Sequence, residues 1–150
     1  MPSMSIADRR RVQLDDALRG TAALLATVGV EQRVEPSELG LARLVLAGQR
    51  AGLEVPKDAI ALATRMLAQR LAAARPGRTV EVRIPPYVAV QVGHGDGPTH
   101  TRGTPPSVVE TDALTFLRLA TGDISWGDAT AGAVRISGVH ADLSDVFPLA

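Results

Sequence analysis

The chain has 150 residues with 16 basic side chains, 16 acidic side chains and no cysteine. This length suits one domain with a sizeable core, and it is too short for two well-packed domains. The lack of cysteine excludes a disulfide framework, a thiol nucleophile and a cysteine-based metal site. Apolar runs are shorter than the ~18–20 residues of a membrane span and the first residues lack the apolar core of a signal peptide, so we expect a soluble cytoplasmic protein.

The charge is distributed unevenly. Residues 1–78 carry 12 basic and 8 acidic side chains (+4), whereas residues 79–150 carry 4 basic and 8 acidic ones (−4). This asymmetry could direct the N-terminal half toward an anionic lipid or an acidic partner, although it is small beside that of nucleic-acid binders. The four aromatic residues are too few for a base-stacking surface, so we expect no nucleic-acid partner.

Three helices are predicted before any strand. Ser5 and Asp8 have the spacing of a capping box, and Leu14, Leu18 and Leu25 follow a helical period, which predicts a first helix of about twenty residues.

The second helix is predicted to begin at Pro36–Glu38 and to stop around Gly52. The third is predicted from Pro56 to about Ala74, where Pro76 and the glycine after it terminate it.

The hydrophobic period then changes from that of a helix to that of a strand. Alternating apolar residues predict half-buried strands over Thr79–Ile84 and Tyr87–Val92. Pro85-Pro86 cannot adopt the positive φ of a tight primed turn, so we expect a bend or a looser connection there. The segment His94–Pro98 is the better turn, and Thr99–Arg102 is a candidate short third strand.

The C-terminal third alternates strands and short helices. Val108–Glu110 predicts a strand, Thr111 or Asp112 can cap a following helix to about residue 121, and Gly122 supplies the left-handed residue that ends it.

A second short helix is predicted after the Ser125/Asp128 capping box, ending near Gly132. Ala133–Ser137 predicts a strand, and Asp142–Pro148 predicts a last helix of about a turn and a half. The sum is an α+β fold, in which a largely antiparallel sheet of about five strands has helices on one face and follows N-terminal helices.

No catalytic constellation is visible. His94, His100 and His140 lack the spacing of metal ligands, and no serine lies in a nucleophile elbow. The glycines of Gly93–Gly97 lack the strand–turn–helix context of a phosphate loop and suit a hairpin. We therefore expect no catalytic residue, no metal and no cofactor.

The most unusual polar segment surrounds Arg102. This permanent cation, with donors from His100 and Thr101, could bind a carboxylate or phosphate head group. The structural alternative is that Arg102 forms a salt bridge with Glu110 or Asp112.

The C-terminal motifs resemble the sterol carrier protein type 2 superfamily. Its pattern is a strand, an acidic cap, a Phe-Leu-x-Leu-x-x-Gly helix, an Ala-x-x-Gly short helix and a Gly-ended strand. The corresponding residues are Asp112, Phe116–Gly122, Ala129–Gly132 and Val134–Gly138. The preceding run His100–Pro106 is similar to that of a small actinobacterial subgroup, the bacterial sterol carrier protein orthologs. The resemblance covers roughly Ala59 to Leu149, so we expect one domain in which residues 1–55 form a helical extension packed on a core of residues 56–150.

This resemblance implies an apolar tunnel between the sheet and the helices, which accepts acyl chains or sterols and is closed at one end by the terminal segment. The residues that would line or cap it are Phe116, Leu117, Trp126, Phe147 and Leu149, with the head group near His100, Thr101 and Arg102. By physics alone, aromatic and leucine side chains at helical spacing more often fill a core, and the sequence leaves both interpretations open.

The resemblance favours non-enzymatic binding or transfer of an apolar or acyl ligand. The alternative is an interaction or accessory domain with a closed core, either a homodimer or a detached enzyme subunit. Its mark would be the Leu14, Leu18 and Leu25 stripe buried against a second chain instead of its own sheet. A similar domain forms the C-terminal part of mycothiol-dependent maleylpyruvate isomerases and ends some acetyltransferases. Those enzymes rely on a separate domain for metal or acetyl-coenzyme A, and the predicted N-terminal helices here contain no histidine.

Overall fold

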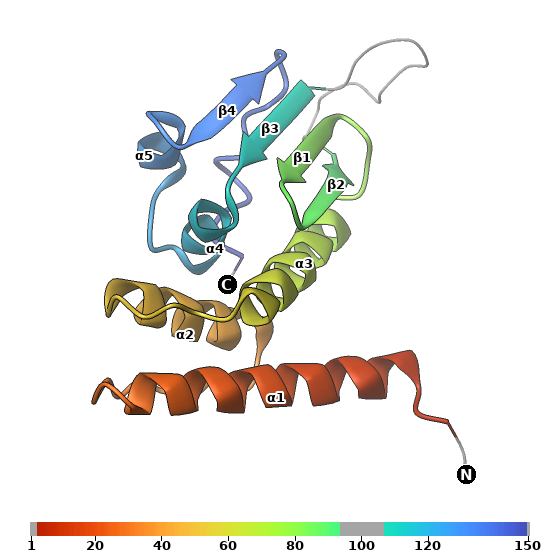
Figure 1. The fold of residues 1–150 in the computed structure, drawn as a ribbon. Helices are drawn as coiled ribbons and strands as arrows, with labels where there is room; N and C mark the ends of the chain where they lie inside the picture. Colours follow the sequence, from red (N-terminus) through yellow and green to blue (C-terminus); the bar gives the residue numbers. More distant parts are fainter. Residues whose placement is uncertain (1–2, 94–106, 150) are drawn as a thin grey trace. The chain divides into compact units, whose positions relative to one another are not determined.

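The computed structural model describes residues 3–93 and 107–149, and its chain divides into two compact units, residues 1–63 and 64–150. Figure 1 shows the α+β order, with three helices before the first strand, as the sequence predicted. The elements are α1 (Ile6–Ala26), α2 (Glu38–Arg50), α3 (Lys57–Ala74), β1 (Val80–Ile84), β2 (Val88–Val92), β3 (Ser107–Thr111), α4 (Ala113–Thr121), α5 (Trp126–Thr130) and β4 (Val134–Ser137). The boundary between the units falls within α3.

The first unit is built on the pairing of α1 with α2. The predicted cap is confirmed: Ser5 Oγ accepts from the Asp8 backbone N–H at 3.1 Å and donates to the Asp8 carboxylate at 2.7 Å. The second of these hydrogen bonds lowers the pKa of Asp8, because it stabilises the charged carboxylate. Ser37 caps α2 in the same way, with its Oγ accepting from the N–H of Gly40 at 3.0 Å.

The leucine stripe of α1 packs inside its own unit. Leu18 and Leu25 are buried, and Leu14 is half-buried. Leu25 comes so close to α2 that a methyl group at Gly48 would lie 3.9 Å from its Cδ2. The stripe therefore packs against α2, an arrangement that the sequence did not predict.

The second unit contains a mixed sheet with the strand order β2-β1-β3-β4. The two outer pairings are antiparallel, but β1 and β3 run parallel. The expectation of five largely antiparallel strands is thus not confirmed: the described residues form four strands, and the candidate strand Thr99–Arg102 and the turn His94–Pro98 lie outside them. The chain leaves β2 and enters β3 at the same end of the sheet, the end where β1 begins. Val92, the last residue of β2, pairs with Val80 at the start of β1, and Ser107, the first residue of β3, pairs with the same Val80. Both β1 and β3 therefore start at this end and run in the same direction.

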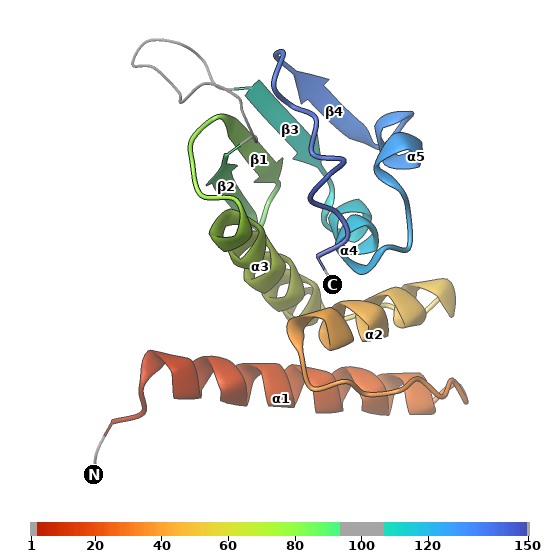
Figure 2. The same cartoon turned by 180° about the vertical axis from the view of Figure 1, so that it is seen from behind.

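One face of this sheet is covered and the other is open. Val80, Val82 and Ile84 of β1 are buried, whereas Arg83 between them is exposed, which confirms the predicted alternation. On the open face Arg83 Nε donates to Glu81 at 2.5 Å, and this hydrogen bond raises the pKa of Arg83. Figure 2 shows the C-terminal segment running along β3 and β4 toward α4, on the covered side.

The connection between β1 and β2 is tighter than expected. It contains only Pro85, Pro86 and Tyr87, and the Tyr87 N–H donates to the Ile84 carbonyl at 2.9 Å. The Pro85–Pro86 bond is cis, and no residue of this connection has a positive φ.

The predicted boundaries of α4 and α5 are confirmed. The Asp112 carboxylate accepts from the N–H of Thr115 at 3.1 Å, and Gly122 ends α4 with a φ of 80°. Ser125 Oγ accepts from the N–H of Asp128 at 3.1 Å at the start of α5.

The prediction of a C-terminal helix over Asp142–Pro148 is wrong. Asp142 does accept from the N–H of Ser144 at 2.9 Å, but the chain then makes only one turn, in which the Val146 N–H donates to the Leu143 carbonyl at 3.1 Å. Starting a helix is unfavourable and is offset only by further backbone hydrogen bonds as the helix lengthens. Pro148 has no N–H with which to form such a bond.

A buried hydroxyl in α3 gives a first testable prediction. Thr64 is completely buried, and its Oγ1 has no hydrogen-bond partner among the described residues. Thr64→Val should raise the free energy of unfolding by about 1 kcal/mol, because it removes an unpaired polar group. Thr115→Val is the matched control: its hydroxyl donates to the Asp112 carboxylate at 2.6 Å, so that variant should lose about 1–2 kcal/mol. Urea unfolding measures both, and changes of the same sign would contradict the assignment.

Candidate functional site

Three aromatic side chains from separate parts of the second unit meet at one place. The ring centroids of Phe116 and Phe147 lie 6.2 Å apart with an interplanar angle of 83°, an edge-to-face contact. Trp126 and Phe147 lie 6.0 Å apart at 11°, which is a stacked pair. Both geometries are favoured by the aromatic quadrupole. Phe147 is therefore the centre of this aromatic cluster, which we define as Phe116, Trp126 and Phe147.

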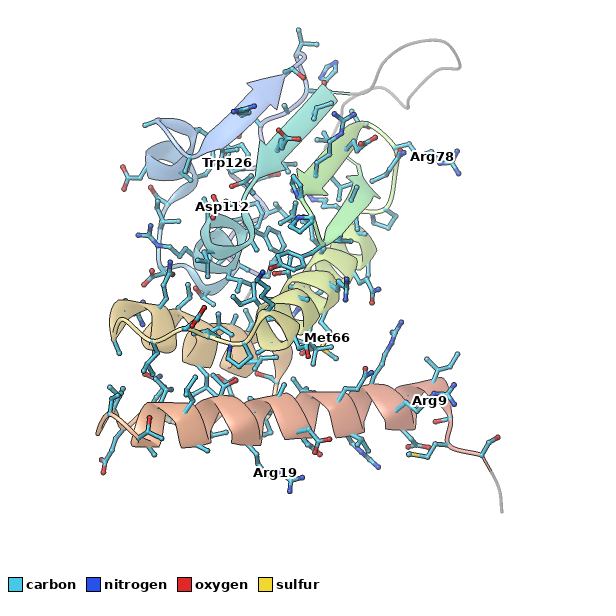
Figure 3. All side chains as sticks on the ribbon, viewed as in Figure 1. Arg9, Arg19, Met66, Arg78, Asp112 and Trp126 are labelled. Atoms are coloured by element: carbon cyan, nitrogen blue, oxygen red, sulfur yellow. The ribbon has the colours of Figure 1, made fainter. Side chains whose placement is uncertain are left out.

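Local structure explains how two of these rings are presented. Phe116 lies on the buried stripe of α4, whose register is fixed by the Asp112 cap four residues earlier. Trp126 is the first residue of α5, directly after its cap Ser125. Figure 3 shows Trp126 on α5 and Asp112 at the start of α4, in the same region of the second unit. Two short capped helices thus each present one ring to Phe147.

The third ring is held by the C-terminal segment. The Leu149 N–H donates to the Ala120 carbonyl at 2.9 Å, near the end of α4. Pro148 lies over Gly122, where an added Cβ would be 3.5 Å from the proline ring. On the other side of Phe147, the Asp145 carboxylate forms an ion pair with Arg75. The segment is therefore tied down on both sides of the ring that it contributes.

The aromatic cluster extends from the interior of the second unit to its surface. Phe116 is 1% exposed, and Leu117 and Leu149 are also buried. Trp126 and Phe147 are only half-buried. Such an arrangement offers large apolar surfaces next to solvent.

Of the residues expected at the site, the structure brings Phe116, Trp126 and Phe147 together. Leu149 is hydrogen-bonded to α4 beside them, and Leu117 is fully buried in that helix. The expected head-group residues His100, Thr101 and Arg102 lie outside the described residues.

The Arg75–Asp145 ion pair was not predicted. Its partners are 70 residues apart, and no spacing rule connects them. A weak signal was present in the sequence, because Arg75 follows the predicted third helix, where a basic residue is favourable.

Within residues 3–93 and 107–149, no three histidine, aspartate or glutamate side chains are grouped as metal ligands would be. In the same ranges no helix combines the length and the hydropathy needed to cross a bilayer.

The chain matches a known protein family. Residues 56–149 match the model of the family described as bacterial SCP ortholog. The match begins just before α3 and includes every strand, α4, α5 and the C-terminal segment, but it leaves out α1 and α2. No curated protein matches the chain.

Proposed function

Because the chain belongs to the bacterial SCP ortholog family, where SCP denotes sterol carrier protein, we propose that it binds or transfers an apolar or acyl ligand without converting it. The apolar part of the ligand lies against Phe116, Leu117, Trp126, Phe147 and Leu149. The family match includes all five of these residues.

The observation that supports this proposal best is the half-buried pair of Trp126 and Phe147 over the buried ring of Phe116. Phe147 belongs to a segment that follows the last strand and is anchored on either side of the ring by the Leu149–Ala120 hydrogen bond and the Arg75–Asp145 ion pair. Movement of this segment would uncover Phe116. An acyl chain would then replace the lost contacts, because burial of apolar surface contributes about 25 cal/mol per Å².

The polar end of the ligand is proposed to lie near His100, Thr101 and Arg102. An arginine at the mouth of an apolar site would bind a carboxylate or phosphate through charge-assisted hydrogen bonds. The cytoplasmic location and the packing of residues 1–55 on the core stay predictions of the sequence.

The competing proposal, an interaction or accessory domain with a closed core, is less well supported. The feature that would mark it is the Leu14, Leu18 and Leu25 stripe, and α2 occupies this stripe within the first unit. That the protein forms a homodimer remains a prediction from the sequence.

The test is native purification, extraction with organic solvent and mass spectrometry of what co-purifies, beside displacement of a fluorescent fatty acid. We expect a stoichiometric acyl ligand, and a roughly tenfold loss of affinity in Trp126→Ala, because the stacked ring contributes contact area to the ligand. Arg102→Ala should weaken binding if the polar end of the ligand lies near His100, Thr101 and Arg102. Tyr87→Ala is the matched control, since Tyr87 is half-buried but lies outside the aromatic cluster. An empty extract together with no displacement at high micromolar lipid would refute the proposal and favour a protein partner.

A further inference from the structure

Arg75 occupies a fixed position at the end of α3. Its backbone N–H donates to the Leu71 carbonyl at 3.0 Å, and its own carbonyl accepts from the Gly93 N–H at 2.8 Å. The backbone is thus anchored both to the helix and to the residue that follows β2. Its side chain is 24% exposed, so most of a permanent cation is withdrawn from water.

The two terminal nitrogens of this guanidinium differ. Nη2 pairs with the carboxylate of Asp145, whose side chain is 61% exposed. Nη1 is buried and has no hydrogen-bond partner among the described residues. Buried charged donors are almost always paired, because losing water without gaining an acceptor is unfavourable. The ion pair to Asp145 satisfies Nη2 but leaves Nη1 without an acceptor among the described residues.

This unpaired donor is linked to the aromatic cluster through Asp145. Asp145 is two residues from Phe147, so no more than about 7 Å of chain separates the ion pair from the central ring. A ligand whose apolar chain contacts Phe147 would have its polar end within reach of Arg75. We propose that Arg75 Nη1 binds the anionic head group, a carboxylate or a phosphate, of a single-chain lipid. This inference rests on the proposed function and places the head group at Arg75 instead of near His100, Thr101 and Arg102, so Arg102→Ala should leave the preference for the anion unchanged.

The positive charge of Arg75 itself favours an anion at Nη1. A guanidinium can hold two acidic groups at once, because its N–H donors lie on separate edges of a plane. Asp145 is mostly in water, so its repulsion of a second anion is screened. A neutral alcohol would supply a weaker acceptor to the buried donor. The site should therefore bind a fatty acid more tightly than the alcohol of the same chain length.

The experiment uses the full chain and the fluorescence of Trp126, its only tryptophan. The probes are hexadecanoate, hexadecyl phosphate and hexadecanol at pH 8. Wild type should bind at least one of the two anions about tenfold or more tightly than the alcohol, and the tighter anion identifies the head group. Arg75→Met should lose this preference while its affinity for hexadecanol stays within about twofold. Arg78→Met is the matched control, since Figure 3 shows Arg78 pointing outward from the segment between α3 and β1.

Asp145→Asn separates head-group binding from a merely structural role of the ion pair. It removes the pair but leaves the guanidinium, so it should keep or increase the preference for the anion. An equal loss of preference in Asp145→Asn and Arg75→Met would overturn the proposal, as would a preference that survives in Arg75→Met. Should Arg75→Met not fold, Arg75→Gln retains an amide donor without the charge and should reduce the preference. Equal binding of all three probes by wild type would reject the head-group site alone, whereas binding of none would reject the proposed function with it.

Discussion

Phe116→Ala is expected to lower the free energy of unfolding by about 3–5 kcal/mol. The ring is 1% exposed and makes the edge-to-face contact with Phe147, so its removal loses both the burial of a large apolar surface and one side of the aromatic cluster. The cavity left behind closes only partly, because the helix that carries the ring is held at its start by the Asp112 cap. Urea unfolding followed by circular dichroism measures the change.

A double-mutant cycle tests whether the cluster acts as a unit. Phe147→Ala removes a half-buried ring and should cost less than Phe116→Ala. The coupling between the two substitutions should be about 0.5–1.5 kcal/mol, the value typical of aromatic pairs beyond their buried area. Phe116→Leu serves as the control, because it preserves most of the volume and should cost much less than the alanine variant. A cost below about 1 kcal/mol for Phe116→Ala would contradict the packing of α4 against the C-terminal segment.

The helices and their boundaries were predictable because their signals are local. Ser5, Asp112 and Ser125 each cap a helix from within three residues, so the sequence alone contains both the donor and the acceptor. The alternation in β1 likewise reports the two faces of a sheet through neighbouring residues. Where a local signal was too short to act alone, as between Asp142 and Pro148, the prediction was wrong.

The pairing of strands and the geometry of the site could not be predicted in this way. Whether β3 runs parallel or antiparallel to β1 depends on contacts between Val80 and Ser107, 27 positions apart in the chain, and the apolar pattern of each strand suits either direction. The residues of the aromatic cluster came from the family resemblance, but the stacking of Trp126 on Phe147 did not. The ion pair of Arg75 with Asp145 depends on the complete fold of the second unit.

Gly138→Ala is expected to lower the free energy of unfolding by about 2–5 kcal/mol. Gly138 follows β4 with a φ of 90°, a conformation that costs a residue with a Cβ about 1–2 kcal/mol. It also lies directly against Ser107, the first residue of β3: an added Cβ would be 2.8 Å from the Ser107 Cα. Because that atom is backbone, the clash is relieved only if the strands move apart, which adds about 1–3 kcal/mol.

Gly122→Ala separates the conformational cost of a positive φ from the cost of the steric clash with Ser107. Its φ of 80° is similar, but an added Cβ would meet Pro148 at the ordinary contact distance of 3.5 Å, so this variant should show the conformational cost alone, about 1–2 kcal/mol. Both glycines lie in the second unit, and chemical denaturation compares them under the same conditions. Adding Ser107→Ala to Gly138→Ala should recover only part of the loss, because the Ser107 Cα and Cβ remain in the way. Equal losses in the two glycine variants would show that the end of β4 does not lie against β3 as closely as the register of Val108 with Ser137 requires.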